Sequence, residues 1–172
     1  MSKFVAGGYT ATYNSKALGQ MAEGIRTSYE MFKQIIRGHL GAQTPQDAVY
    51  QGQQRSSSFR LIEADESGIP DLLYPFTSTI GNEWELGVIG LMVVRGQGSG
   101  SPTVRGKSLV LTAVSGTSAY NDAAQTMTFP ISILHENFPV EVLLGPELKE
   151  VPVRLRHYPD MAASPPSFGS ST

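Results

Sequence analysis

The chain of 172 residues carries 13 basic and 15 acidic side chains, for a formal net charge of −2. Without clustered Lys and Arg, this balance excludes the electrostatic footprint of tight nucleic-acid binding. Because cysteine is absent, structural disulfides, thiolate nucleophiles and cysteine-ligated zinc are excluded as well. Charged residues make up 16%, below the usual value of about a quarter, and this indicates one β-rich globular domain with neutral polar surfaces.

No segment is expected to enter a membrane. The N-terminal sequence MSKFVAGGYTATY contains no long apolar run, so we expect no secretory signal. The longest apolar stretch, Val88 to Val94, is interrupted by Gly90 and is far too short to span a bilayer.

The first elements in chain order are an arm and a short strand. Residues 1–8 predict an N-terminal arm that precedes a main domain over residues 9–159. Tyr9 to Tyr13 alternates in the manner of a strand, and the polar residues from Asn14 to Lys16 predict a turn. Gly19 to Gly24 is expected to be irregular.

The segment from Ile25 to Arg37 fits two periods. Ile25, Tyr29 and Phe32 recur at helical spacing, whereas Ile25, Thr27 and Tyr29 alternate as in a strand. Frequent β-branched and aromatic residues and the lack of a helix cap favour a strand. Gly38 to Asp47 then predicts a long loop.

The most informative segment runs from Ala48 to Ala64 and is expected to be a strand. Its middle, Gln51 to Ser58, is polar on both alternating faces. A strand inside one closed monomer normally shows an apolar side to its own core. The pattern therefore predicts that this strand lies against a neighbouring subunit on one face and water on the other.

A short helix is expected over residues 66–75. Ser67 is a suitable N-cap, Pro70 is tolerated in the first turn and Asp71 favours the helix N-terminus. The acidic residues just before it, Glu63, Asp65 and Glu66, are interpreted as a solvated strand end rather than as a cation site.

The second half is expected to consist of strands and loops. The predicted strands are Glu85 to Arg95, Gly106 to Ser115, Thr126 to Leu134, Val140 to Leu144 and Val151 to Tyr158. Gly96 to Pro102 predicts a hairpin tip or hinge. Residues 160–172, rich in Pro and Ser, predict a mobile or docking tail.

The sequence contains no recognisable catalytic, metal-binding or phosphate-binding motif. His39, His135 and His157 lack metal-ligand spacing and are interpreted as surface or turn residues. No G-x-S-x-G motif is present, and the glycine-rich segment at 96–100 does not open a helix as a phosphate loop would. Trp84 is interpreted as an interface anchor or a residue at the edge of the core. We therefore expect no enzyme, no cofactor and no metal.

Four segments together resemble phage tail tube proteins, the major tail proteins of long-tailed phages. These segments are YTATYNSKALG, TPQDAVYQG, LIEADESGIPDLLYPF and FPISILHENFPVEVLLGPELKEVPVRLRHYP. The likeness covers about residues 9–159 through loose patterns. It implies a β-sandwich or small β-barrel with one flanking helix, which forms hexameric rings that stack into the channel for genome delivery.

The resemblance also implies partners and candidate residues. Partners would be further copies of the chain, the terminator, the distal tail or baseplate, the tape measure and, transiently, passing DNA, all in a virion made in the host cytoplasm. Candidate channel-lining residues are Gln51, Gln53, Arg55 and Ser57. Gln97, Gly98, Ser99 and Gly100 form a candidate ring-stacking loop, and Tyr9, Tyr13 and Trp84 are candidate interface residues.

Two other functions remain open from the sequence. A tail terminator, an adaptor or a capsid cement protein would share such a fold but cap an assembly. A monomeric β-barrel that binds a small ligand would need a large apolar interior, which the polar residues from Gln51 to Ser58 disfavour.

Overall fold

The computed structural model describes residues 9–22, 24–37, 45–64, 68–73, 106–113, 126–136, 150–160 and 167–171. The strands among these residues are β1 (Tyr9–Tyr13), β2 (Lys16–Ala17), β3 (Gly19–Met21), β4 (Arg26–Arg37), β5 (Pro45–Ala64), β6 (Lys107–Ala113), β7 (Thr126–Leu134), β8 (Val151–Tyr158) and β9 (Ser170–Ser171). One short helix, α1 (Ile69–Leu73), accompanies them. The expectation of a mainly β fold with one short helix is confirmed.

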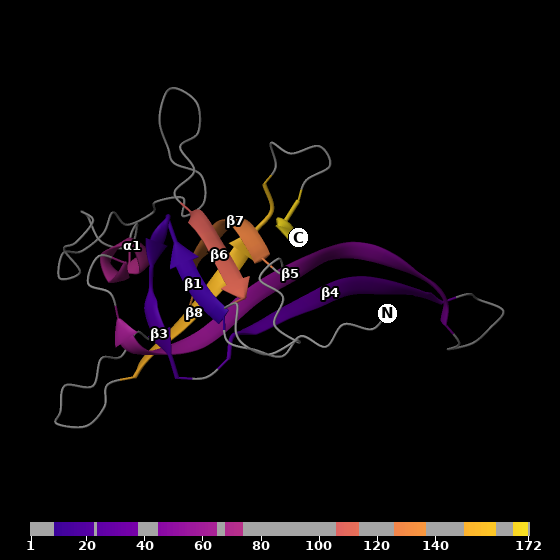
Figure 1. The fold of residues 1–172 in the computed structure, drawn as a ribbon. Coiled ribbons are helices and arrows are strands. Elements are labelled where there is room, and N and C mark those ends of the chain that lie inside the picture. Colours follow the sequence, from indigo (N-terminus) through magenta and orange to yellow (C-terminus); the bar gives the residue numbers. More distant parts are fainter. Residues whose placement is uncertain are drawn as a thin grey trace, which may run out of the picture.

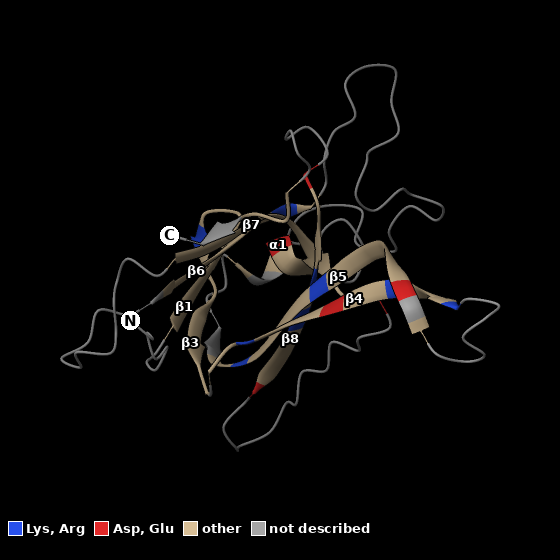
Figure 2. Cartoon of the chain, turned by 90° about the vertical axis from the view of Figure 1, so that its right-hand side faces the viewer, with Lys and Arg blue, Asp and Glu red and all other residues tan. Residues whose placement is uncertain are grey.

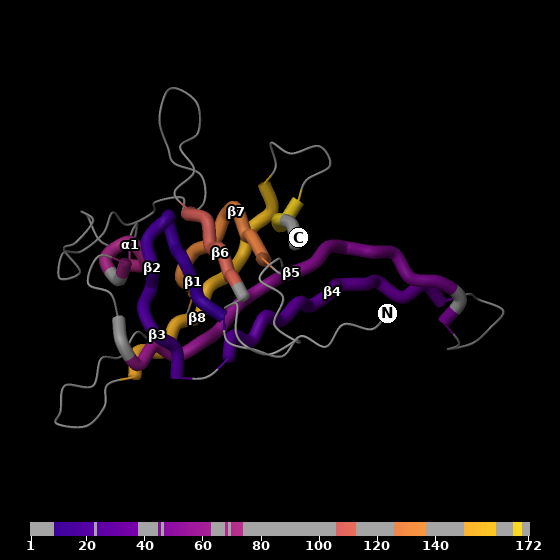
Figure 3. The backbone as a smooth tube through the Cα atoms, in the orientation of Figure 1, coloured from indigo at the N-terminus to yellow at the C-terminus, as the bar shows by residue number. Residues whose placement is uncertain are grey.

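The strands form a single antiparallel sheet that curls into a nearly closed barrel (Figure 1). Its order is β2-β1-β6-β7-β8-β5-β3, while β4 pairs with β5 and β9 pairs with β7. The two ends of this path approach each other, because the amide of Leu18, between β2 and β3, donates to the carbonyl of Ala11 in β1 at 3.1 Å. Figure 3 shows β1, β2 and β3 together on this side of the barrel.

Alternate side chains fill the barrel. A residue on a strand shares its face with the residues two places away, so every second side chain points inward. The buried core consists of Ala11, Tyr13, Leu18, Phe59, Leu61, Leu72, Leu109, Leu111, Phe129, Val153 and Leu155. The interior is thus packed with apolar side chains, as in other barrels of small circumference.

Several predicted elements are confirmed at their stated positions. The strands from Tyr9 to Tyr13, Thr126 to Leu134 and Val151 to Tyr158 have the expected bounds, and β6 lies within its predicted range. The expected turn joins β1 to β2, with φ of 51° at Asn14 and 65° at Ser15. Two consecutive positive φ values are typical of a two-residue turn whose twist matches that of its strands.

Other predictions need correction. The stretch from Gly19 to Gly24 contains β3, which pairs with the end of β5, so part of it is regular. The helix begins at Ile69 rather than at residue 66, because Gly68 is still in a turn, and β5 begins at Pro45, inside the predicted loop. Within the tail that is expected to be mobile or to dock, β9 pairs with the barrel, against Met127 and Thr128.

Some predictions fall on residues that the structure does not describe. These are the arm over residues 1–8, the strands predicted at 85–95 and 140–144, the loop residues Gln97, Gly98, Ser99 and Gly100, and Trp84.

Tyr13 is a core residue rather than a candidate interface residue. Its side chain is fully buried, and its hydroxyl donates to the carbonyl of Ser132 at 2.9 Å. Burial is the main cause that raises the pKa of this hydroxyl above its ordinary value. Tyr9, on the same face of β1, is partly buried against the core.

A buried carboxylate joins α1 to the first hairpin. The side chain of Asp71 is 2% exposed, and it accepts hydrogen bonds from Asn14 Nδ2 at 2.6 Å and from Lys16 Nζ at 3.2 Å. A hydrogen bond to a charged group is stronger than one between neutral groups. The acid that the sequence assigns to helix stabilisation therefore anchors the helix to the β1–β2 turn.

We predict that Asp71→Ala lowers the free energy of unfolding by about 1–3 kcal/mol, because two partly buried donors lose their charged acceptor. Urea denaturation of the purified protein measures this change. The matched control is Glu30→Ala, whose exposed carboxylate has no described partner and whose loss should cost less than about 0.5 kcal/mol. Equal stability of both variants would contradict the anchoring role of Asp71.

Candidate assembly interface: the β4–β5 hairpin

The longest strand of the structure belongs to the barrel at one end and leaves it at the other. β8 pairs with β5 only from Arg55 to Leu61, whereas β4 pairs with β5 from Pro45 to Ser58. Among the described strands, residues 45–54 of β5 therefore have β4 as their only partner. Figure 1 shows the two strands projecting from the barrel as a two-stranded arm, which we call the hairpin.

A β-bulge divides the hairpin. Phe32 lies opposite Gly52, but the next residue of β4, Lys33, lies opposite Tyr50, so that Gln51 is the extra residue. Gly52 has a φ of 133°, which side chains other than glycine rarely adopt. Because of the extra residue, one side of β5 carries Asp47 and Val49 before the bulge and Gly52 and Gln54 after it. A second register shift near the tip places Pro45 opposite Arg37.

The hairpin has two faces that the register defines. Cross-strand partners share a face, and the hydroxyl contacts of Thr27 with Ser57 and of Ser28 with Ser56 confirm this at the base. The inward face continues the barrel interior and carries Thr27, Tyr29, Met31, Lys33, Ile35 and Arg37 with their partners Ser57, Arg55, Gln53, Tyr50, Ala48 and Pro45. The outward face carries Arg26, Ser28, Glu30, Phe32, Gln34 and Ile36 with Ser58, Ser56, Gln54, Gly52, Val49 and Asp47.

Both faces expose large apolar side chains. Every residue of β4 is exposed. The exposed apolar residues are Tyr29, Met31, Ile35 and Tyr50 on the inward face and Phe32, Ile36 and Val49 on the outward face. The strand favoured for this segment is confirmed, and the two-sided distribution explains why its apolar residues fit a helical period as well as a strand period.

An isolated two-stranded hairpin is at best marginally stable in water, and its unpaired edges invite further strands. A contiguous exposed apolar surface marks an interaction site in a soluble protein. The described part of the chain supplies no cover for this surface, so the hairpin is the candidate interface of the molecule.

The candidate channel-lining residues separate into two groups. Gln51 is exposed, and its amide donates to Gln34 Oε1 at 2.9 Å, while Gln53 and Arg55 are partly exposed on the inward face. Ser57, in contrast, is fully buried inside the barrel. The assignment of Ser57 to a channel wall is therefore corrected, because its side chain reaches no surface of the chain.

The buried polar residues of β5 are explained by a network within the chain. Ser57 Oγ lies 2.8 Å from His157 Nε2, and Ser132 Oγ lies 2.8 Å from His157 Nδ1. Ser57 also contacts the hydroxyl of Thr27 at 3.1 Å, and the imidazole stacks on Phe129 with 3.9 Å between ring centroids. The network thus joins β4, β5, β7 and β8 at the base of the hairpin.

The network has a consistent direction. Ser132 Oγ is 3.5 Å from the carbonyl of Phe129, which can only accept, so Ser132 donates there and accepts from His157 Nδ1–H. His157 Nε2 then accepts from Ser57. Burial, and secondarily the positive charge of Arg55, lowers the pKa of His157 to about 4, so the ring is neutral at pH 7.

The interpretation of His157 as a surface or turn residue is wrong. A signal for its burial was present in the sequence, because His157 shares its face of β8 with the core residues Val153 and Leu155. The partners Ser57 and Ser132 lie 100 and 25 residues away, and no local pattern indicates them.

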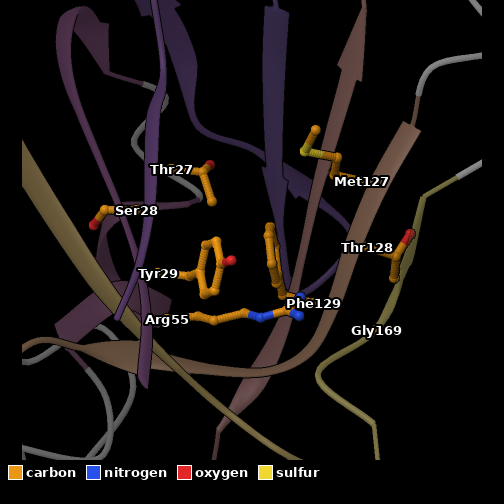
Figure 4. A pocket seen from close by; sticks show the side chains of 8 residues that line it. All are labelled: Thr27, Ser28, Tyr29, Arg55, Met127, Thr128, Phe129 and Gly169. Atoms are coloured by element: carbon orange, nitrogen blue, oxygen red, sulfur yellow. The ribbon is translucent and has the colours of Figure 1, made fainter. Parts of the chain in front are cut away.

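A cavity of about 450 Å³ opens beside this network, at the base of the hairpin. In Figure 4 the side chains of Tyr29 and Arg55 extend toward Phe129, whereas Ser28 points away. The guanidinium of Arg55 lies 5.1 Å from the ring centroid of Phe168, and its buried Nε has no hydrogen-bond partner. Arg55 forms no ion pair with described residues, so the cavity offers a cation to an anionic group.

No family model and no curated protein matches the chain. Among the residues that the structure describes, no group of three or more His, Asp or Glu side chains is placed to hold a metal ion. The side chains of Glu63, Asp65 and Glu66 lie outside this set. In the same part of the chain, no helix is long and apolar enough to cross a membrane.

We predict that stability falls by about 3 kcal/mol between pH 6.5 and pH 4 through His157 alone. The unfolded chain binds a proton at this residue near pH 6.5, but the folded chain does not until about pH 4. The contribution is therefore complete above pH 6.5 and is lost as the pH falls through this window. Urea denaturation at several pH values measures it.

The variant His157→Gln should lack this part of the pH dependence, whereas the control His135→Gln should retain it. The control histidine has little burial, although burial and the neighbouring arginines lower its pKa as well. An unchanged pH profile in His157→Gln would show that the imidazole does not titrate as its environment requires.

Proposed function

We propose that this protein is a structural subunit that assembles with copies of itself, in the manner of a phage tail tube protein. The hairpin carries the proposal, because its apolar side chains are exposed on both faces and its outer strand edges have no partner among the described strands. Such a surface is costly in an isolated chain and suits one that is covered by neighbours.

The finer architecture of the proposal comes from the resemblance in sequence. The subunits would form hexameric rings, and stacked rings would make the tube through which the genome passes. Cyclic association gives every copy the same neighbours and leaves no unmatched surface within a ring. The sandwich arrangement typical of the family would arise where the curled sheet of one subunit packs against the next.

Gln51, Gln53 and Arg55 remain candidates for the channel wall. Neutral amides bind water without holding phosphates strongly, which suits transient contact with passing DNA. The loop residues Gln97, Gly98, Ser99 and Gly100 remain the candidate contacts between rings. Terminator, distal tail or baseplate and tape measure proteins would be the other partners in the virion, and the proposed work is mechanical rather than catalytic.

A ligand-binding barrel is less consistent with the core. Tyr13, Leu61, Leu109, Leu111 and Leu155 occupy the interior with at most 2% exposure. A pocket for a small ligand needs a concave apolar space that these side chains would have to leave open. The described cavity lies at the rim, beside the hairpin, where a neighbouring subunit can reach it.

We predict that the purified protein at high concentration forms hollow tubes with a regular axial repeat, visible by negative-stain electron microscopy. The triple variant Tyr29→Ser, Ile35→Ser and Tyr50→Ser should remain monomeric, because it removes exposed apolar surface of the hairpin. Its fold should persist, since none of these side chains belongs to the core.

The matched control replaces two exposed barrel residues, Ala17→Ser and Gln20→Ser, and should assemble as the wild type does. Isolated rings would favour a terminator or adaptor. Wild-type protein that stays monomeric at all concentrations would argue against self-assembly.

A further inference from the structure

The two faces of the hairpin carry charges of opposite sign. The inward face carries Lys33, Arg37 and Arg55 and no acidic residue within the described register. The outward face carries Glu30 and Asp47, and its basic residue, Arg26, lies at the base of the hairpin next to the barrel. Figure 2 shows these acidic and basic positions along β4 and β5.

The charges on the projecting part are available to a partner. Lys33, Arg37, Glu30 and Asp47 are all exposed, and none of them forms an ion pair with a described residue. Asp47 Oδ1 accepts only from the amide of the adjacent Ala48, at 2.7 Å. Solvated charges of this kind are free to pair across an interface at little cost in desolvation.

The charges are interleaved with the exposed apolar residues. On the inward face Lys33 lies between Met31 and Ile35 along β4, and on the outward face Glu30 is two residues from Phe32. Each face therefore combines an apolar surface with charge of one sign. Apolar burial would supply affinity, and charge would select which face meets which.

We propose that the inward face of one copy's hairpin packs on the outward face of the next copy's hairpin. In this arrangement Gln53 and Arg55, on the inward face, belong to the contact between copies rather than to the channel wall. This proposal rests on the proposed self-assembly and specifies its contact. Two inward faces in contact would bring Lys33 and Arg37 against like charges, and two outward faces would do the same for Glu30 and Asp47. The pairing of unlike faces removes both conflicts.

A contact between unlike faces has a direction. Each copy uses one face to bind its predecessor and the other to bind its successor, so that the contact repeats rather than ending in a two-fold dimer. Repetition closes into a ring or continues as a filament. The charge pattern of a single hairpin thereby favours a head-to-tail assembly of identical chains over a two-fold dimer.

The experiment uses three full-length variants. The inward variant carries Lys33→Glu and Arg37→Glu, the outward variant carries Glu30→Lys and Asp47→Lys, and the swapped variant carries all four changes. Circular dichroism and thermal unfolding establish that each one folds. Sedimentation velocity then measures the assembled fraction of each variant alone and of the inward and outward variants mixed.

We expect the inward and outward variants alone to self-associate about tenfold more weakly than the wild type, because like charges then face each other. Their equimolar mixture should assemble, since acidic and basic hairpins can alternate. The swapped variant should assemble alone, because its two faces are again complementary. Salt at about 1 M, with a Debye length of roughly 3 Å, should reduce the differences.

Two outcomes would overturn the inference while leaving self-assembly intact. In the first, the wild type assembles and each reversed variant does so equally well. In the second, the reversed variants fail but neither the mixture nor the swapped variant recovers. A wild type that never assembles would instead refute the proposed function itself.

Discussion

The structure depends on the antiparallel pairing of one strand, β5, with different neighbours along its two edges. Near its C-terminal end it pairs with β8 on one edge and with β3 and β4 on the other, and this closes the barrel. Toward its N-terminal end only β4 remains as a described partner. Because β5 runs from the barrel into the hairpin, the packed core fixes the direction in which the hairpin projects. The buried network of Ser57, His157 and Ser132 stabilises the junction between the two.

Much of the barrel could be predicted from the sequence, because its strands obey a local rule. In β1, β6 and β8 buried apolar residues recur at every second position, as in Ala11 and Tyr13, Leu109 and Leu111, and Val153 and Leu155, and this alternation is visible without knowledge of the partners. The polar middle of β5 obeys no such rule. Ser57 is satisfied by an imidazole 100 residues away, so its burial follows from tertiary contacts that the sequence does not display.

In the candidate interface, apolar residues are exposed where their pattern suggests burial. The apolar residues of β4 suggest burial, yet Tyr29, Ile35 and Tyr50 of the hairpin are more than half exposed in the single chain. Their pattern makes sense only for a strand covered on both sides. The sequence predicts that the polar residues from Gln51 to Ser58 lie at a subunit boundary. In the structure, the exposed candidates for such a boundary are instead the apolar residues of the hairpin.

The extra residue at Gln51 has a consequence for how this chain tolerates change in length. If Gln51 joined the regular ladder, Val49 and Asp47 would turn to the same side as Gln53 and Arg55, and acidic and basic groups would share one face. Deletion of Gln51 itself would leave every charge on its present face, because Gly52 and Tyr50 already alternate without it. Deletion of Ala48 with the bulge kept would instead turn Asp47 to the side of Arg55 without altering any charged residue. Removal of two consecutive residues from each strand preserves the alternation and would leave the distinction between the faces intact. The separation of charge between the two sides of the hairpin thus depends on the number of residues between the charged positions as well as on which residues are charged.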